Sequence, residues 1–80
     1  MDSLFRMELM TKRLRSIGHA VAQARIHNHL SQTTLAVMIG RSDHAYISRI
    51  ECGKQAPSLD VLFDLADALE VEVKYFFTEI

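Results

Sequence analysis

The sequence predicts a small all-α domain of four or five short helices. Apolar residues recur every three or four positions in successive segments, as they do on one face of a helix. Residues that favour helix N-caps precede three of these segments, and glycines follow two of them. Only three glycines and one proline occur in 80 residues, which disfavours many short strands joined by tight turns. The hydrophobic share of 49% is enough for one compact core.

The first two helices are expected at residues 14–27 and residues 31–39. In the first, apolar side chains follow helical spacing from Leu14 to Ala24. Ser31 can cap the second, since its hydroxyl can accept a hydrogen bond from a backbone N–H two or three residues later. Gly40 can adopt a left-handed conformation and end that helix.

A third helix is expected from His44 to Cys52, with either Ser42 or Asp43 as its N-cap. Gly53 would end it. Because only a few residues separate this helix from the second one, the pair has the form of a helix-turn-helix. The expected buried side chains are Ile47 and Ile50, with Ala45 or Tyr46 beside them.

A fourth helix is expected after Pro57, because the proline favours an extended entry and Ser58 is a good N-cap. Its expected buried face consists of Leu59, Leu62, Phe63, Ala66 and Leu69. The last segment, residues 71–77, is compatible with a short fifth helix or with a strand, because its apolar residues alternate.

The net charge of −1 hides an uneven distribution. Residues 1–30 hold five basic and two acidic side chains, whereas residues 58–80 hold one basic and six acidic side chains. A polyanion responds to the local patch rather than to the sum, so the first part of the chain could face phosphates. Solvated helix faces would give the same composition.

The composition also indicates what the chain is not expected to contain. The single cysteine, Cys52, cannot form an internal disulfide and fits a reducing compartment. Signal-peptide and membrane-span patterns are lacking, so a soluble cytoplasmic protein is expected. His19, His27 and His29 do not complete a metal-ligand set, and no nucleophile–base pattern occurs. We therefore expect no metal, no cofactor and no catalysis.

Much of the chain carries motifs with defined spacing. They are Ser31-Gln32-x-x-Leu35-Ala36, Gly40, Tyr46-Ile47-Ser48-Arg49-Ile50-Glu51-x-Gly53-Lys54, Pro57-Ser58-Leu59 and Ala66-x-x-Leu69, with Ile17-Gly18 and Arg25 upstream. On these residues, segment 14–77 resembles the Cro/repressor-type helix-turn-helix family, also called XRE. The resemblance implies a compact five-helix bundle of the lambda-repressor-like DNA-binding type for residues 14–80, with residues 1–13 as an N-terminal extension.

The resemblance implies that the third helix, about residues 43–52, lies in the DNA major groove while the second helix braces it. The residues expected to contact bases are Asp43, His44, Ala45, Ser48 and Arg49. Arg49 suits guanine, because a guanidinium can bridge two acceptors of that base. Asp43 could accept from a cytosine amino group, although helix capping is favoured for a carboxylate near phosphates.

Other residues are implied to contact phosphate, to stabilise the fold or to form a dimer. The phosphate group comprises Gln32, Thr33, Arg41, Ser42, Tyr46, Lys54 and Gln55. Arg25 and Glu51 match positions that pair in relatives, although Arg25 could instead reach phosphate. The dimer interface would comprise Tyr75, Phe76, Phe77 and Ile80, although some of these side chains could close the monomer core instead.

The sequence therefore predicts a sequence-specific transcription regulator that binds double-stranded DNA, with a homodimeric repressor favoured. The alternative is an antitoxin or adaptor that binds a partner protein through its C-terminal region. One departure from the family pattern affects the base contacts: the segment between Gly40 and Tyr46 is one residue longer than usual. The resemblance does not distinguish phage repressors, restriction–modification controllers and antitoxins.

Overall fold

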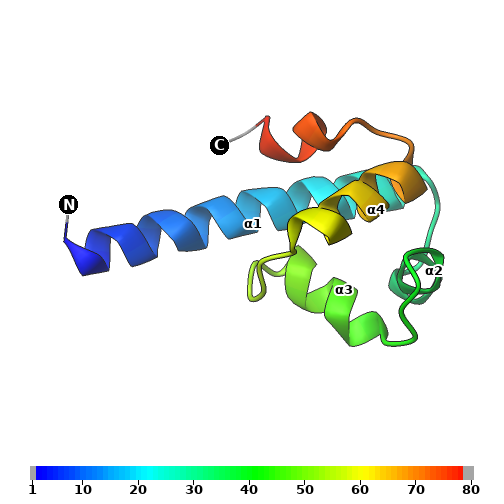
Figure 1. Ribbon diagram of the computed structural model, residues 1–80, viewed down its shortest axis with the longest axis horizontal. Coiled ribbons are helices and arrows are strands. Elements are labelled where there is room, and N and C mark those ends of the chain that lie inside the picture. Colours follow the sequence, from blue (N-terminus) through cyan, green and yellow to red (C-terminus); the bar gives the residue numbers. More distant parts are fainter. Residues whose placement is uncertain (1, 79–80) are drawn as a thin grey trace.

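The computed structural model describes residues 2–78, which form four α-helices and one short 3-10 helix (Figure 1). The all-α prediction is confirmed. The five-helix count holds only in part, because the last element is a 3-10 helix and not an α-helix. None of the helices in this part of the chain is both long and apolar enough to span a membrane. The elements are α1 (Ser3–His27), α2 (Gln32–Met38), α3 (His44–Glu51), α4 (Leu59–Leu69) and η1 (Val73–Phe77).

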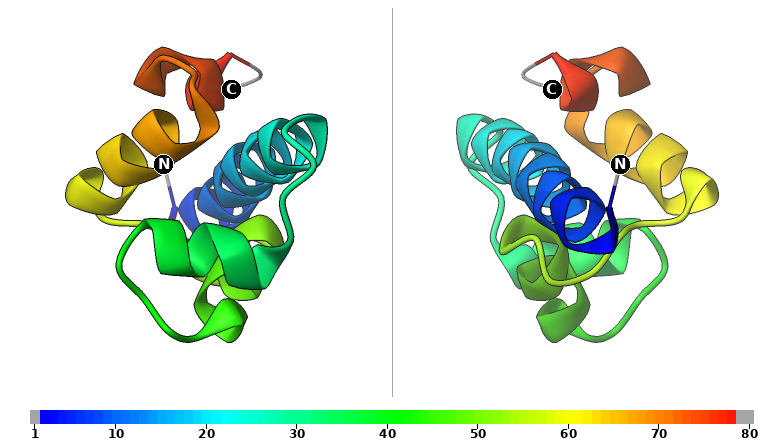
Figure 2. Two further views of the ribbon diagram at one scale, coloured as in Figure 1. Left: turned by 90° about the vertical axis from the view of Figure 1, so that its right-hand side faces the viewer. Right: turned by 90° about the vertical axis from the view of Figure 1, so that its left-hand side faces the viewer.

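The long helix α1 is the axis of the molecule. The α2–α3 pair lies on one side of it and η1 lies on the other (Figures 1 and 2). The buried residues of α1 all lie between Ile17 and Ala24, so only the C-terminal half is covered by the other helices. Residues 3–13 continue the same helix beyond them, and the Asp2 carboxylate caps it by accepting from the Phe5 N–H at 2.7 Å. A domain boundary at residue 14 stays a prediction.

The helix starts follow the capping residues that the sequence contains. Ser31 accepts from the Thr34 N–H at 2.9 Å, and Ser58 accepts from the Val61 N–H at 3.3 Å. Each bond satisfies one backbone donor that the first helical turn leaves without a partner. The predicted N-caps of α2 and α4 are thereby confirmed.

The core lies between α1, α2, α3, α4 and η1. Its largest fully buried side chains are Val21, Leu35, Ile47, Ile50, Leu65, Leu69 and Phe76. The prediction was wrong for Leu59 and Phe63, which are 64% and 50% exposed. They lie four residues apart on a ridge of α4 that faces away from α1, while Val61, Leu62 and Leu65 face inward.

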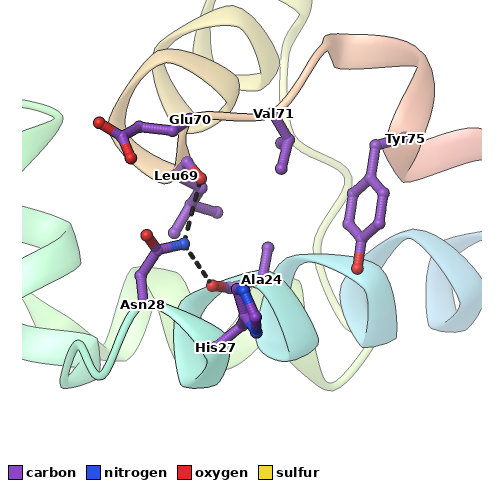
Figure 3. Close-up of a pocket in the computed structure, with 7 residues that line it drawn as sticks. All are labelled: Ala24, His27, Asn28, Leu69, Glu70, Val71 and Tyr75. Carbon is purple, nitrogen blue, oxygen red and sulfur yellow. Dashed lines mark hydrogen bonds between the residues drawn. The ribbon is translucent and has the colours of Figure 1, made fainter.

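The C-terminal segment folds back onto the body after α4. Glu70 makes the turn with a φ of 58°, a left-handed conformation that glycine adopts at lower cost. The Asn28 side-chain amide ties this turn to the end of α1 by donating to the carbonyls of Ala24 and Leu69 (Figure 3). The ends of the two helices are therefore held together.

The structure corrects one predicted dimer contact. Phe76 is 1% exposed and packs in the core of its own chain, because η1 turns its ring toward α1. Tyr75 is partly buried against the same core, and Phe77 remains 42% exposed. Ile80 lies outside the described residues.

Gly18 allows α1 and α3 to approach closely. A Cβ atom at this position would overlap the Ile50 carbonyl oxygen and lie 2.7 Å from that of Glu51. Both obstacles are backbone atoms, so neither can move aside without shifting the end of α3. A side chain at residue 18 would therefore push α1 and α3 apart.

We expect Gly18→Ala to lower the free energy of unfolding by about 2–3 kcal/mol, because overpacking at a backbone contact outweighs the gain in helix propensity. Urea unfolding followed by circular dichroism would measure it. Gln23→Ala, at an exposed position of the same helix, serves as the control and should change stability by less than about 0.5 kcal/mol. A stabilised Gly18→Ala protein would contradict the close approach.

Candidate nucleic-acid interface

The turn between α2 and α3 covers residues 39–43. Gly40 has a φ of 82°, in the left-handed region that the sequence predicted. The N–H groups of Gly40 and Arg41 donate to the carbonyls of Val37 and Ala36 at 2.9 and 2.8 Å. These bonds satisfy the last carbonyls of α2 and fix the direction in which the chain enters α3.

Helix α3 has a buried face and an open face. Tyr46, Ile47 and Ile50 are buried against the body. The predicted base-contacting residues occupy the other side: His44 and Arg49 are exposed, and Ala45 and Ser48 are half-buried. The four side chains lie on one accessible side of α3, and we name this surface the open strip. An exposed row of side chains on one side of a helix is the geometry that groove binding requires.

Asp43 lies directly before this strip, and its carboxylate is engaged within the chain. Its Oδ1 atom accepts from the Ala45 N–H at 2.9 Å, so Asp43 is the N-cap of α3. The negative charge is favourable there, because the N-terminus of a helix carries a partial positive charge.

Tyr46 underlies the guanidinium groups of Arg41 and Arg49. The Arg41 Cζ atom lies 3.8 Å from the centre of the Tyr46 ring, and that of Arg49 lies 6.0 Å from it. Tyr46 is only 6% exposed, because its ring packs in the core and supports Arg41 through a cation–π contact; its phosphate contact stays a prediction.

Gln55 holds Arg49 in place, an interaction that the sequence reasoning missed. The Arg49 Nε donates to the Gln55 Oε1 at 2.8 Å. The two residues are brought together by the left-handed turn at Gly53, where φ is 75°. The two terminal nitrogens of the exposed guanidinium remain available as a pair of donors.

A hydrogen-bonded network behind α3 connects it to α1 and α2. The Glu51 carboxylate accepts from the Arg25 Nε at 2.7 Å and from the Arg25 Nη2 at 3.0 Å. The Arg25 Nη1 also donates to the Leu30 carbonyl at 2.8 Å. The hydrogen bond to Glu51 raises the pKa of Arg25 above its usual value, although burial acts in the opposite direction.

Gln32 takes part in this network, although the sequence reasoning placed it among the phosphate contacts. Its Nε2 atom donates to the Glu51 Oε1 at 3.0 Å. This bond anchors the first residue of α2 to the last residue of α3. The remaining predicted phosphate contacts, Thr33, Ser42 and Lys54, have exposed side chains around the strip.

The described residues contain no cluster of three or more histidine, cysteine, aspartate or glutamate side chains arranged like metal ligands. Three basic side chains are exposed around the open strip: Arg41, Arg49 and Lys54. The strip is therefore suited to a polyanion whose grooves present hydrogen-bond acceptors.

Comparison with known proteins agrees with this geometry. A family described as Helix-turn-helix matches residues 21–76. An uncharacterized transcriptional regulator in the ATPase CF(0) region of Rhodospirillum rubrum is 39% identical over 64 residues; the match covers 80% of this chain and 58% of that protein. The crystal structure of the restriction-modification controller protein C.AhdI from Aeromonas hydrophila superposes with a TM-score of 0.75 at 34% identity, covering 80% of this chain and 96% of that one. Neither relative is described as an enzyme.

We expect Glu51→Gln to lower the free energy of unfolding by about 2–4 kcal/mol, because it leaves the Arg25 charge partly buried without its counter-ion. Glu72→Gln is the matched control: its partner Lys74 lies 3.1 Å away, but both side chains are more than three-quarters exposed, so the loss should stay below about 0.5 kcal/mol. Equal losses from both variants, measured by urea unfolding, would show that the Arg25–Glu51 pair has no special structural role.

Proposed function

The chain belongs to the Cro/repressor-type helix-turn-helix family, also called XRE, and on this premise we propose that it is a DNA-binding transcription regulator that acts as a homodimeric repressor. The two relatives are a transcriptional regulator and a restriction-modification controller protein. The family match over residues 21–76 includes both helices of the helix-turn-helix, α2 and α3. The chain spans 58% of the length of the curated relative, so its full range of activities is part of the proposal.

The observation that carries the proposal is the arrangement of Arg49 on the open strip of α3. Gln55 and the Tyr46 ring orient the guanidinium, and its terminal nitrogens have no partner within residues 2–78. A planar pair of donors held in this way matches the N7 and O6 acceptors of guanine in the major groove. His44, Ala45 and Ser48 would contact the neighbouring bases.

Phosphate contacts would fix the position of α3 in the groove. Arg41, Lys54 and Thr33 are exposed around the strip and can reach the two backbones that border it. Arg41 is stacked on Tyr46, so it loses little freedom on binding. Residues 31–57, which include α2, α3 and the turn between them, hold three basic and two acidic side chains, so a chain of net charge −1 can present a locally basic surface to a polyanion.

Repression would follow from two protomers covering a promoter together. The partly exposed Tyr75 and the exposed Phe77 offer an apolar contact for a second copy at the C-terminal end. A two-fold dimer would place two α3 helices on half-sites about 34 Å apart on one face of the duplex. Occupancy of the site would then exclude RNA polymerase.

Binding of a partner protein through the C-terminal region is the second candidate. The exposed Phe77 ring and the acidic side chains near it, such as Glu72, support this possibility. The two candidates differ in stoichiometry: a repressor binds its DNA site as a homodimer without another protein, whereas an antitoxin is isolated together with its toxin.

We expect Arg49→Ala to weaken binding to the site that the wild type selects from a pool of random duplexes by about 5- to 150-fold, which corresponds to about 1–3 kcal/mol of lost base readout. Fluorescence anisotropy on the selected duplex and on a scrambled duplex would measure it. Binding to the scrambled duplex should change much less. An unchanged affinity for the selected duplex would contradict the role of Arg49.

Salt dependence provides a separate prediction for the phosphate contacts. The logarithm of the binding constant should fall linearly with the logarithm of salt concentration, with about 0.9 units of slope per phosphate contact. Lys54→Ala should reduce this slope by about one unit and weaken selected and scrambled duplexes alike. A flat response to salt would exclude phosphate contacts as a source of affinity.

A further inference from the structure

The first three turns of α1 form a helical arm, residues 3–13, that other elements of the chain leave uncovered. The first buried residue of α1 is Ile17, and apart from the half-buried Leu9 the side chains of residues 3–13 are exposed. The arm projects past the α3–α4 loop (Figure 1). The arm also lies outside the segment that matches the helix-turn-helix family.

One face of the arm continues the core-facing stripe of α1. Met7, Met10, Leu14, Ile17 and Val21 follow one another at intervals of three or four residues, so they lie on one side of the helix. Ile17 and Val21 are buried in the core, whereas Met7 and Met10 are 67% and 51% exposed. The stripe that packs against the body therefore extends about two turns beyond it.

The exposed apolar side chains of the arm favour a packing partner. Most helical stability in proteins comes from the packing of an apolar face, and the buried residues of α1 begin only at Ile17. The arm also exposes Leu4 and Phe5, at 66% and 52%. Phe5 lies two residues from Met7 and therefore on another side of the helix, so the stripe through Met7 and Met10 is the continuous apolar exposure that marks an interaction surface.

The charges beside the stripe indicate what the partner carries. Arg6 and Arg13 flank Met10 at helical spacings of four and three residues and line one groove with Met7. Within residues 2–78 neither arginine forms an ion pair or a side-chain hydrogen bond. The complementary partner would present apolar side chains bordered by carboxylates.

Such a surface exists on α4 of the same sequence. Leu59 and Phe63, the two residues wrongly predicted as core, form an exposed apolar ridge one helical turn apart. Asp60, Asp64 and Asp67 lie beside them, exposed and without ion pairs in the described part of the chain. We name the surface formed by these five residues the acidic face.

We propose that the arm of one protomer packs across the acidic face of α4 in a second copy of this chain. Met7 and Met10 would cover Leu59 and Phe63 of the other copy, and Arg6 and Arg13 would pair with its aspartates. In a two-fold assembly the contact forms twice, once from each arm. It adds to the C-terminal contact proposed above but is independent of it and of DNA.

Paired charge reversals test this contact. Arg6→Glu with Arg13→Glu and, separately, Asp60→Lys with Asp64→Lys should each raise the dimer dissociation constant by about tenfold or more, because each reversal acts at both symmetric contacts. Sedimentation equilibrium of the full chain without DNA measures it. An equimolar mixture of the two variants should dimerise as well as the wild type, since every contact in the mixed dimer again pairs opposite charges.

Lys12→Glu is the control within the arm. Lys12 is two residues from Met10 and therefore lies on the opposite side of the helix, so its reversal should leave the dimer dissociation constant unchanged. Arg13→Glu alone should raise that constant. The proposal is overturned if the chain is monomeric, if both paired reversals dimerise like the wild type, or if the mixture fails to recover. If the protein dimerises and selects a DNA motif but the charge reversals do not behave as expected, only the arm contact is contradicted. If the charge reversals behave as expected but the wild type selects no DNA motif, only the proposed function is contradicted.

Discussion

The ion pair between Arg25 and Glu51 determines where α3 lies. Glu51 is the last residue of α3, and its carboxylate receives hydrogen bonds from α1, through Arg25, and from α2, through Gln32. Arg25 also holds the Leu30 carbonyl in the connection that precedes α2. A desolvated pair of this kind contributes little net stability, but it strongly disfavours any arrangement in which one charge lacks its partner. The ion pair and the close approach at Gly18 together disfavour other positions of α3 relative to α1.

With α3 fixed from behind, its open strip can be arranged for recognition. Arg41 is held by the Tyr46 ring and Arg49 by the Gln55 amide, so both guanidinium groups are oriented before any ligand binds. Preorganised donors lose less conformational entropy on binding than free side chains do. The near-neutral net charge does not oppose this function, because Arg41, Arg49 and Lys54 are exposed around the strip and a polyanion responds to the local patch.

The sequence predicted the features that depend on local chemistry. The N-caps at Ser31 and Ser58 and the left-handed glycines need only neighbouring residues, so their positions could be inferred. Leu59 and Phe63 were assigned to the core incorrectly, because helical spacing does not tell which of two overlapping apolar ridges faces inward. The support of Arg49 by Gln55 could not be inferred, since it depends on how the chain folds back after α3.

The central claim is that the open strip of α3 reads DNA sequence as part of a dimer. Selection from a pool of random duplexes, with sequencing of the bound fraction, tests it most directly. We expect a two-fold symmetric motif whose half-sites lie about 34 Å apart, one turn of the double helix. A bound fraction with the same sequence composition as the input pool would contradict it.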